Sequence, residues 1–236
     1  MSASARLDLK LELALHGYGA PLRLLLEHSR ARELFPRCLT VAYHVSRSMV
    51  PLMEAALERA QELAPGDPVA AGLAAYLERH IPEEMHSAEP GGAVVDDLAA
   101  LGLDPFEVRA LPITPHIATL VAAQLAWISD DHPVAILGFL ELEAHQADRA
   151  VVERLIENTG LPRDAFRQLL LHAKLEPVHA KELHRVLDSL PLEPKHEQLI
   201  GLSALQSMSL VADAFLDVIA DTAPLDEAAG HSRAIV

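Results

Sequence analysis

The sequence is poor in cysteine and has no long uncharged apolar run. Its 236 residues include one cysteine, Cys38, which excludes an intramolecular disulfide and any CxxC metal or redox motif. The apolar flanks of Cys38 favour a buried thiol over a nucleophile. No stretch approaches the roughly 18 to 20 uncharged residues that cross a bilayer. Charges at Asp8, Lys10 and Glu12 interrupt the region where a signal peptide would be apolar, so we expect a cytoplasmic protein without a membrane partner.

Basic residues are also scarce. The chain has 19 Lys and Arg against 34 Asp and Glu, which gives a formal net charge of -15. This sign argues against nucleic-acid phosphates or an anionic membrane as the partner. Most of the acids are compatible with a solvated surface that aids solubility. Several carboxylates that face one another inside a protein are costly unless they are protonated or metal-bound, so a metal site would account for part of the excess.

Alternating polar and apolar segments bounded by turn signals are missing, so we expect no β-strands. Ala and Leu recur instead at helical spacing, and half of the residues are apolar, which is enough for a sizeable core. We predict a single all-α domain over residues 1–222, a bundle of about seven or more helices, with a loose tail at 223–236.

The helix boundaries follow from Gly and Pro signals. We expect helices at about 4–15, 21–30, 31–63, 69–86, 94–101, 116–128, 134–146 and 195–219, with one more long helix between the breaks at 158–162 and 190–194. Pro51 is expected to kink its helix and Pro82 to disturb a turn.

One segment carries three metal-capable side chains at helical spacing. His172, Glu176 and His179 stand at i, i+4 and i+7, and at about 100° per residue they project from one helical face. Divalent iron and manganese accept mixed imidazole and carboxylate ligands, which helix bundles supply from residues spaced i, i+3 or i+4. The pattern favours a metal site over an exposed His/Glu face. Pro177 is expected to loosen the helix beside these ligands.

A second candidate segment lies near residue 85. Glu83 and His86 are three residues apart and share a helical face, whereas Glu84 and His86 are two apart and do not. Glu83 is therefore the preferred ligand. His80 and Glu84 form a competing i, i+4 pair, which is typical of a solvated surface.

A third segment follows an apolar run. Glu143 shares a face with apolar residues that include Phe139, and a buried acid needs a partner. Glu141 would instead pair with His145 on an exposed face, so Glu143 is the preferred ligand. Glu54 is a further carboxylate that the sequence leaves open.

These segments, in this order, resemble the heme-oxygenase-like diiron oxidases and oxygenases, within the wider heme-oxygenase-like and TenA/PqqC fold group. The late helix of that family carries His-x3-Asp-x2-His, which matches His172, Glu176 and His179, with Glu in place of Asp. Its earlier Glu-x-x-His helix and Asp-Leu-x-x-Leu-Gly turn are similar to residues 80–86 and 97–102, although the early motif is one residue shorter here. The match covers about residues 40–190.

The resemblance implies a heme-oxygenase-like bundle that holds two non-heme irons and uses dioxygen to oxidise a small organic acid, amine or amino-acid-like substrate. The choice between Fe/Fe and Mn/Fe stays open. The implied ligands are Glu83, His86, Glu143, His172, Glu176 and His179.

Two other functions remain alternatives: a metal-free TenA/PqqC-like enzyme on the same fold, and a non-catalytic helical binding protein. The apolar final helix, which includes Leu199, Leu202 and Leu205, would either close the bundle or form a homodimer face.

Overall fold

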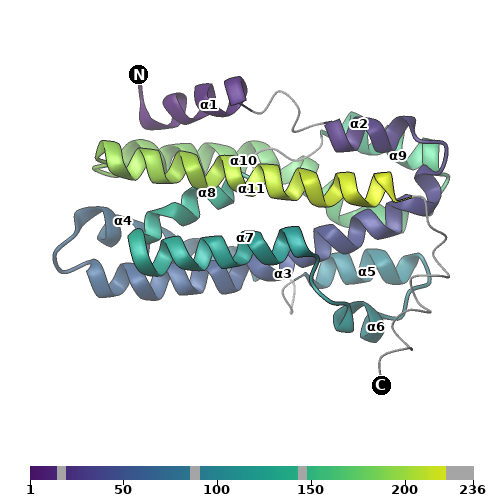
Figure 1. Cartoon of the computed structure of the whole chain (residues 1–236), viewed down its shortest axis with the longest axis horizontal. Helices are drawn as coiled ribbons and strands as arrows, with labels where there is room; N and C mark the ends of the chain where they lie inside the picture. The colour runs from purple at the N-terminus through teal and green to yellow at the C-terminus, as the bar shows by residue number, and fades with distance from the viewer. Residues whose placement is uncertain (15–19, 86–90, 143–147, 222–236) are drawn as a thin grey trace.

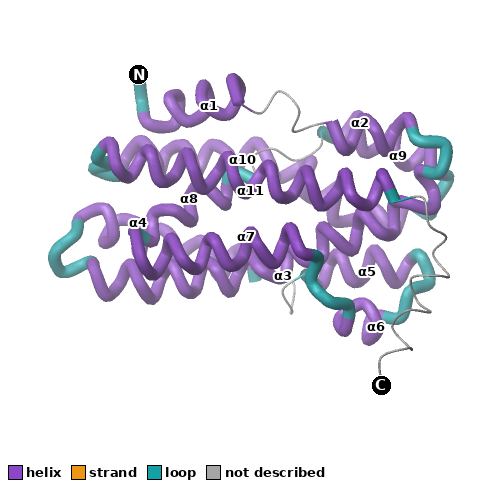
Figure 2. The backbone as a smooth tube through the Cα atoms, in the orientation of Figure 1, coloured by secondary structure: helices purple, strands orange, loops and turns teal. Residues whose placement is uncertain are grey.

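The computed structural model describes residues 1–14, 20–85, 91–142 and 148–221, and every regular element in these ranges is helical (Figure 2). The all-α prediction is confirmed. The elements in chain order are α1 (Ala3–Ala14), α2 (Ala20–Glu27), α3 (Ala31–Leu63), α4 (Pro68–Glu84), α5 (Gly92–Ala100), α6 (Pro105–Ala110), α7 (Pro115–Ala126), the π-helical η1 (Trp127–Asp131), the 3-10 helix η2 (Pro133–Ala135), α8 (Ile136–Leu140), α9 (Arg149–Thr159), the 3-10 helix η4 (Arg163–Phe166), α10 (Arg167–Ser189) and α11 (Pro194–Ala220).

Two long helices, α3 and α11, run along the long axis of the molecule (Figure 1). Helix α3 contacts α4, α5, α7 and α9, and α11 contacts α1, α2, α7 and α8 as well as α3. Helix α3 begins and ends at the predicted residues and contains both Pro36 and Pro51. Most other helices therefore pack against one of these two.

The buried apolar residues form two clusters. The larger one joins the C-terminal half of α3 to α4, α7, α8, α10 and α11. The smaller one joins the N-terminal half of α3 to α2, α5, α9 and η4, and there the rings of Phe35 and Phe166 stack with centroids 4.3 Å apart. The ionisable residues considered below lie mostly around the larger cluster.

Helix α1 is held against α10 and α11 by polar contacts. The backbone N–H and hydroxyl of Ser4 donate to the Asp188 carboxylate of α10 at 2.9 and 3.0 Å. The Arg6 guanidinium donates to Glu197 of α11, with a 2.7 Å bond from Nε. These contacts place Asp8 of α1 beside the bundle.

Helix α11 combines length with strong apolar character. Pro194–Ala220 passes a composition test for a membrane span, with a mean hydropathy of 1.6 over its best window. Its buried residues, however, belong to the core clusters, and it contacts α3, α7 and α8. Packing inside the bundle therefore accounts for its composition.

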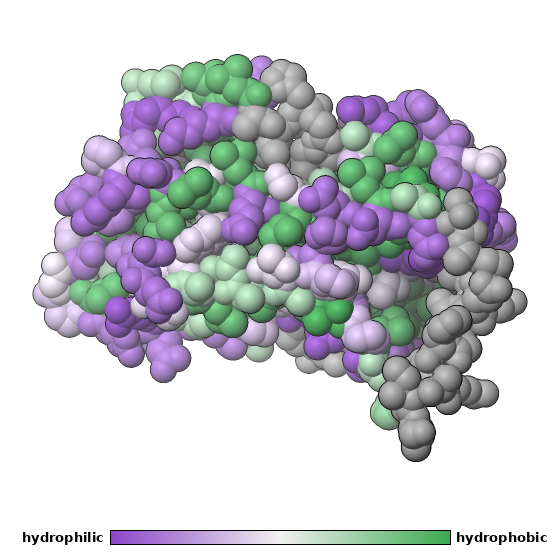
Figure 3. Space-filling view, viewed as in Figure 1, coloured by the Kyte–Doolittle hydropathy of each residue, from purple (hydrophilic) through white to green (hydrophobic). Residues whose placement is uncertain are grey.

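One leucine of α11 faces outward. Leu202 is 50% exposed, and Leu125 on α7 is 45% exposed. Leu199 and Leu205, in contrast, pack against the core. Figure 3 shows apolar side chains over α7 interspersed with polar ones. Most of the apolar face of α11 closes the bundle, and a homodimer face stays a prediction.

The helix boundaries between residues 100 and 160 differ from the prediction. Helices α6 and α9 were not expected, although Asp148 caps α9 and Gly160 ends it with a left-handed φ of 58°, both recognisable signals. Helix α8 ends at Leu140, well before the expected boundary at 146. Residues 127–131 form a π-helix, closed by a bond from the His132 N–H to the Trp127 carbonyl.

Helix α8 makes a close backbone contact with α11 at Gly138. A Cβ on Gly138 would lie 2.2 Å from the Ile200 carbonyl oxygen and 2.7 Å from the Ala204 nitrogen. Both are backbone atoms of a helix that cannot yield locally. The approach of α8, and thus the position of the residues that follow it, requires glycine.

We predict that Gly138→Ala lowers the free energy of unfolding by about 1–3 kcal/mol, because the methyl group forces α8 away from α11. Urea unfolding monitored by circular dichroism measures this. Gly201→Ala is the matched control, since its Cβ would meet only the Lys10 side chain at 3.7 Å; it should be neutral or slightly stabilising. Equal losses in the two variants would contradict the close contact.

Candidate metal centre

Two histidine rings from different helices face each other near the end of α4. His80 of α4 is 3% exposed, and its ring stacks on Tyr76 with centroids 5.0 Å apart. The ring of His179, on α10, meets His80 edge-on at 6.0 Å between centroids. The structure therefore brings the predicted His179 to a histidine that the sequence analysis had treated as part of a surface pair.

Carboxylates surround His80. Glu83 Oε2 lies 3.7 Å from His80 Nδ1, and Glu84 Oε1 lies 3.8 Å from His80 Nε2. Glu182 of α10 joins this group, since ligand atoms of His80, Glu83 and Glu182 all lie within 4.8 Å of one another. Mixed imidazole and carboxylate donors from two helices thus converge on one place.

The preference for Glu83 over Glu84 does not follow from burial. The Glu83 side chain is 55% exposed, whereas Glu84 is 17% exposed. That preference depended on a face shared with His86, which lies outside the described residues. Both acids therefore remain ligand candidates. The solvated-surface interpretation of His80 with Glu84 is wrong, because His80 is buried.

His172 lies on α10, one turn after the start of this helix. The side-chain amide of Gln168 contacts Nε2 of His172. The backbone N–H of Gln168 in turn donates to Asp97 Oδ2 at 3.0 Å. Asp97 is fully buried in α5, and it fixes the first turn of the helix that carries His172 and His179.

Asp97 was used in the sequence only as part of a turn motif, and its buried capping role was missed. Burial raises the pKa of its carboxyl to about 6, while the backbone N–H groups of Gln168 and Arg167 act in the opposite direction. The signal available in the sequence was an acid inside an apolar helix, next to Val94, Val95 and Leu98.

Glu141 is fully buried, so its expected place on an exposed face with His145 is wrong. The physical reason is that α8 ends at Leu140 and Glu141 is its C-cap, so a helical-face argument does not apply there. Ligand atoms of Glu141, Asp8 and His184 lie within 4.8 Å of one another, and His184 Nε2 is 3.3 Å from Asp8 Oδ1. Helix α10 thus contributes to a second group of polar side chains.

The other predicted ligands are placed as follows. His86 and Glu143 lie outside the described residues, and Glu176 lies on α10 without a described side chain. Glu54 is exposed on α3 and does not join the groups above. Cys38 is buried as predicted, and burial raises the pKa of its thiol to about 12, which leaves no thiolate nucleophile at neutral pH.

Comparison with protein families decides the class of the protein. A family model described as iron-containing redox enzyme matches residues 39–212. The chain belongs to this iron-containing redox enzyme family. The match includes α4, α8 and α10, the helices that carry the candidate ligands.

Solved structures show the same fold. A domain of unknown function with a heme oxygenase-like fold from Shewanella denitrificans OS217 has a TM-score of 0.70 at 16% identity, covering 99% of this chain and 93% of its own. A TenA homologue from Pseudomonas syringae pv. tomato DC3000 has a TM-score of 0.59 at 12% identity, covering 89% and 92%. No curated protein matches the sequence. The predicted heme-oxygenase-like bundle is confirmed.

The described donors fit iron. Imidazole and carboxylate are ligands that non-heme iron accepts, and His80, Glu83, Glu182 and His179 supply both from two helices. Nδ1 of His179 is buried and has no hydrogen-bond partner within the described residues. A buried nitrogen of this kind is costly unless it meets a cation or a donor.

The buried Glu141 predicts a pH dependence of the metal-free chain. Burial, followed by the charge of Asp8, raises the pKa of Glu141 from its ordinary 4.5 to about 8. The folded state binds this proton more tightly than the unfolded state. Its contribution to stability is therefore full below pH 4.5 and is lost as the pH rises through about 8.

We predict that Glu141→Gln removes this part of the pH dependence and stabilises the metal-free chain at pH 8 by on the order of a few kcal/mol. Urea unfolding between pH 5 and pH 8.5 measures it. Glu54→Gln, which changes an exposed glutamate, should leave the native pH dependence in place. If native and Glu141→Gln chains lose stability in parallel, Glu141 is not held protonated.

Proposed function

We propose that this protein is a non-heme diiron oxidase or oxygenase that uses dioxygen to oxidise a small organic acid, amine or amino-acid-like substrate. The observation that carries the proposal is the edge-on pair of His80 and His179, surrounded by glutamates from α4 and α10, in a chain of an iron-containing redox enzyme family. His172 and Glu176 lie on α10, the helix that carries His179. His86 and Glu143 complete the proposed ligand set.

Bound ferrous iron would supply the electrons for dioxygen chemistry. The contribution of the chain is to hold the ligands and leave positions open to dioxygen and substrate. The aromatic ring of Tyr76 stacks on His80 and fixes its orientation. Helix α10 is fixed at its start by Asp97 of α5, which helps to position His172 and His179.

A metal-free TenA-like enzyme is the alternative on this fold. The likeness to the TenA homologue is at 12% identity and supports the fold alone. A cysteine nucleophile does not fit, because Cys38 is buried in the smaller core cluster with a raised thiol pKa. A cytoplasmic location, the absence of nucleic-acid and membrane partners, and a homodimer remain parts of the proposal.

The native chain, reconstituted anaerobically with ferrous iron and desalted, is expected to bind about two irons by elemental analysis. His179→Gln should bind at most about half as much, because an amide is a poor replacement for an imidazole ligand. His116→Gln is the control, since His116 pairs with Asp217 on the surface between α7 and α11. A native chain that retains no iron, or equal iron in His179→Gln, contradicts the proposal.

Dioxygen reactivity is a separate expectation. Mixing the ferrous chain with oxygenated buffer should give a transient visible absorbance in a stopped-flow experiment, with net dioxygen consumption. The zinc-loaded chain, which cannot donate electrons, should show neither. Iron that binds in stoichiometric amount but does not react with dioxygen would leave an iron-binding protein and overturn the oxidase assignment.

A further inference from the structure

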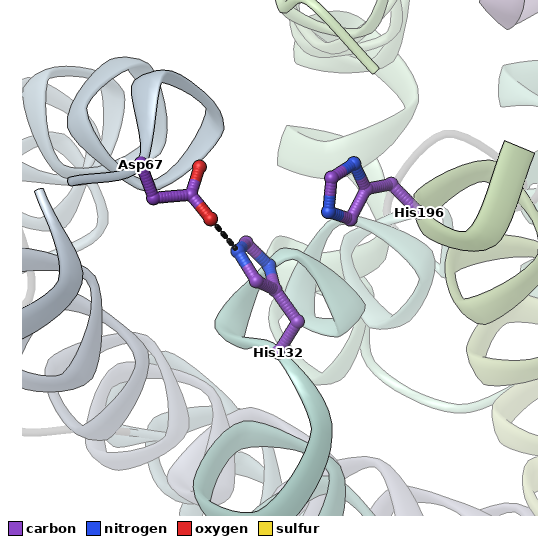
Figure 4. A group of neighbouring side chains, drawn as sticks. All are labelled: Asp67, His132 and His196. Atoms are coloured by element: carbon purple, nitrogen blue, oxygen red, sulfur yellow. Dashed lines mark hydrogen bonds and ion pairs between the residues drawn. The ribbon is translucent and has the colours of Figure 1, made fainter. Parts of the chain in front are cut away.

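Three helix N-termini meet at the end of α4 that lies away from His80. Asp67 is the N-cap of α4 and His132 is the N-cap of η2. His196 is the third residue of α11 and closes the capping box that begins at Glu193. Element η2 contacts both α4 and α11. Figure 4 shows the three side chains directed toward one another from these separate elements.

The contacts among the three side chains are short. His132 Nε2 lies 3.1 Å from Asp67 Oδ2 (Figure 4). The other oxygen of Asp67 accepts the Val69 N–H at 2.8 Å. The rings of His132 and His196 have centroids 4.8 Å apart. One carboxylate and two imidazoles have the composition of a zinc site.

The hydrogen bonds argue against a metal. Nδ1 of His132 accepts the Val134 N–H at 3.1 Å, and Nδ1 of His196 accepts the Glu193 N–H at 3.1 Å. A neutral imidazole has one lone-pair nitrogen, so both rings carry their proton on Nε2. Nε2 of His132 accordingly donates to Asp67, and neither Nε2 offers a lone pair to a cation.

His196 is the most constrained member. It is 4% exposed, and its Nε2 has no hydrogen-bond partner within the described residues. A second proton would have to enter at Nδ1, where it would oppose the Glu193 N–H and break the capping box.

We propose that Asp67, His132 and His196 form an acid-sensitive clamp. In the neutral form each imidazole accepts a backbone N–H of its own element. His132 joins η2 to α4 through its bond to Asp67, and the ring of His196 joins α11 to this pair through its contact with the His132 ring. When the ring of His196 takes up a proton at Nδ1, its cap is lost and α11 separates from this end of the bundle.

The surroundings of His196 favour its neutral form. Burial is the largest cause that lowers the pKa of His196, followed by His132 and Lys195, while Asp67 and Glu193 oppose the shift. The partial positive charge of the helix N-termini also disfavours a cation there. Stability from the neutral ring is therefore full above its ordinary pKa of 6.5 and is lost as the pH falls below that value.

The clamp has a consequence for the metal centre. It joins the start of α4 to the start of α11, which follows α10 after a short connection. Helices α4 and α10 are those that carry His80 and His179, so opening the clamp would loosen the far ends of both. This consequence rests on the proposed function, whereas the clamp itself does not.

The test uses the full metal-free chain labelled with nitrogen-15. Histidine ring spectra at pH 7.5 should show His132 and His196 in the Nε2–H form. The exchange of the Glu193 amide, corrected for intrinsic rates, should accelerate as the pH falls from 7.5 to 5.5, by up to about tenfold per pH unit below 6.5. An Nδ1–H form of either ring would overturn the proposal.

Two variants separate the clamp from general acid sensitivity. His196→Gln keeps an acceptor for the Glu193 N–H, as glutamine does in capping boxes, but does not titrate. It should lose more than half of the native acid response on a logarithmic scale, and a smaller loss contradicts the proposal. His116→Gln removes a histidine paired with Asp217 at 3.0 Å outside the clamp, and it should keep the full response.

A zinc titration tests the competing assignment. The native chain and His196→Gln should bind zinc in equal amounts, because the clamp offers no lone pair. Zinc bound by the native chain and lost in His196→Gln would replace the clamp with a metal site. If His196→Gln fails to fold, the ring spectra of the native chain still decide, and neither outcome depends on iron binding.

Discussion

Burying imidazoles and carboxylates inside an apolar bundle costs free energy unless these groups face one another, a backbone dipole or a cation. This constraint governs the arrangement of α4, α8 and α10. His80 is buried against Tyr76 with glutamates on either side, Asp97 caps the start of α10, and Glu141 is held in a form that burial keeps protonated. The apolar clusters hold the helices together, and these polar groups have to be accommodated between them.

The two ends of α4 meet this constraint differently. At its C-terminal end, His80 and its carboxylate neighbours face His179 and provide donors suited to iron. At its N-terminal end, Asp67 accepts backbone N–H groups and a histidine proton, and the two imidazole lone pairs already accept backbone N–H groups. Residue composition alone would assign a metal to both ends, and the direction of the hydrogen bonds distinguishes them.

Much of the fold could be predicted from the sequence, because helical spacing and caps are local signals. Helix α3 begins and ends as predicted, and α4 begins at Pro68, one residue before the predicted start. Helix α9 was missed although Asp148 and Gly160 mark its ends. The close contact at Gly138 depends on the backbone of α11 and has no local signal.

The candidate site was less predictable because it depends on contacts between helices. The spacing of residues 172–179 led to α10 and to His179. His80 was considered only as an alternative surface partner of Glu84, since nothing in its own helix shows that α10 covers it. Glu141 was predicted to be exposed because the helix was expected to continue past it. The end of α8 at Leu140 places the Glu141 side chain differently. Which acid of the pair Glu83 and Glu84 binds a metal is likewise a question of tertiary position.

The most direct test of the central claim is a crystal structure of the ferrous chain, grown anaerobically, with anomalous difference maps at the iron edge. The account predicts two iron peaks between α4 and α10, one of them within bonding distance of His179 or His80. Iron peaks absent from this region, or found instead beside His132 and His196, would contradict it.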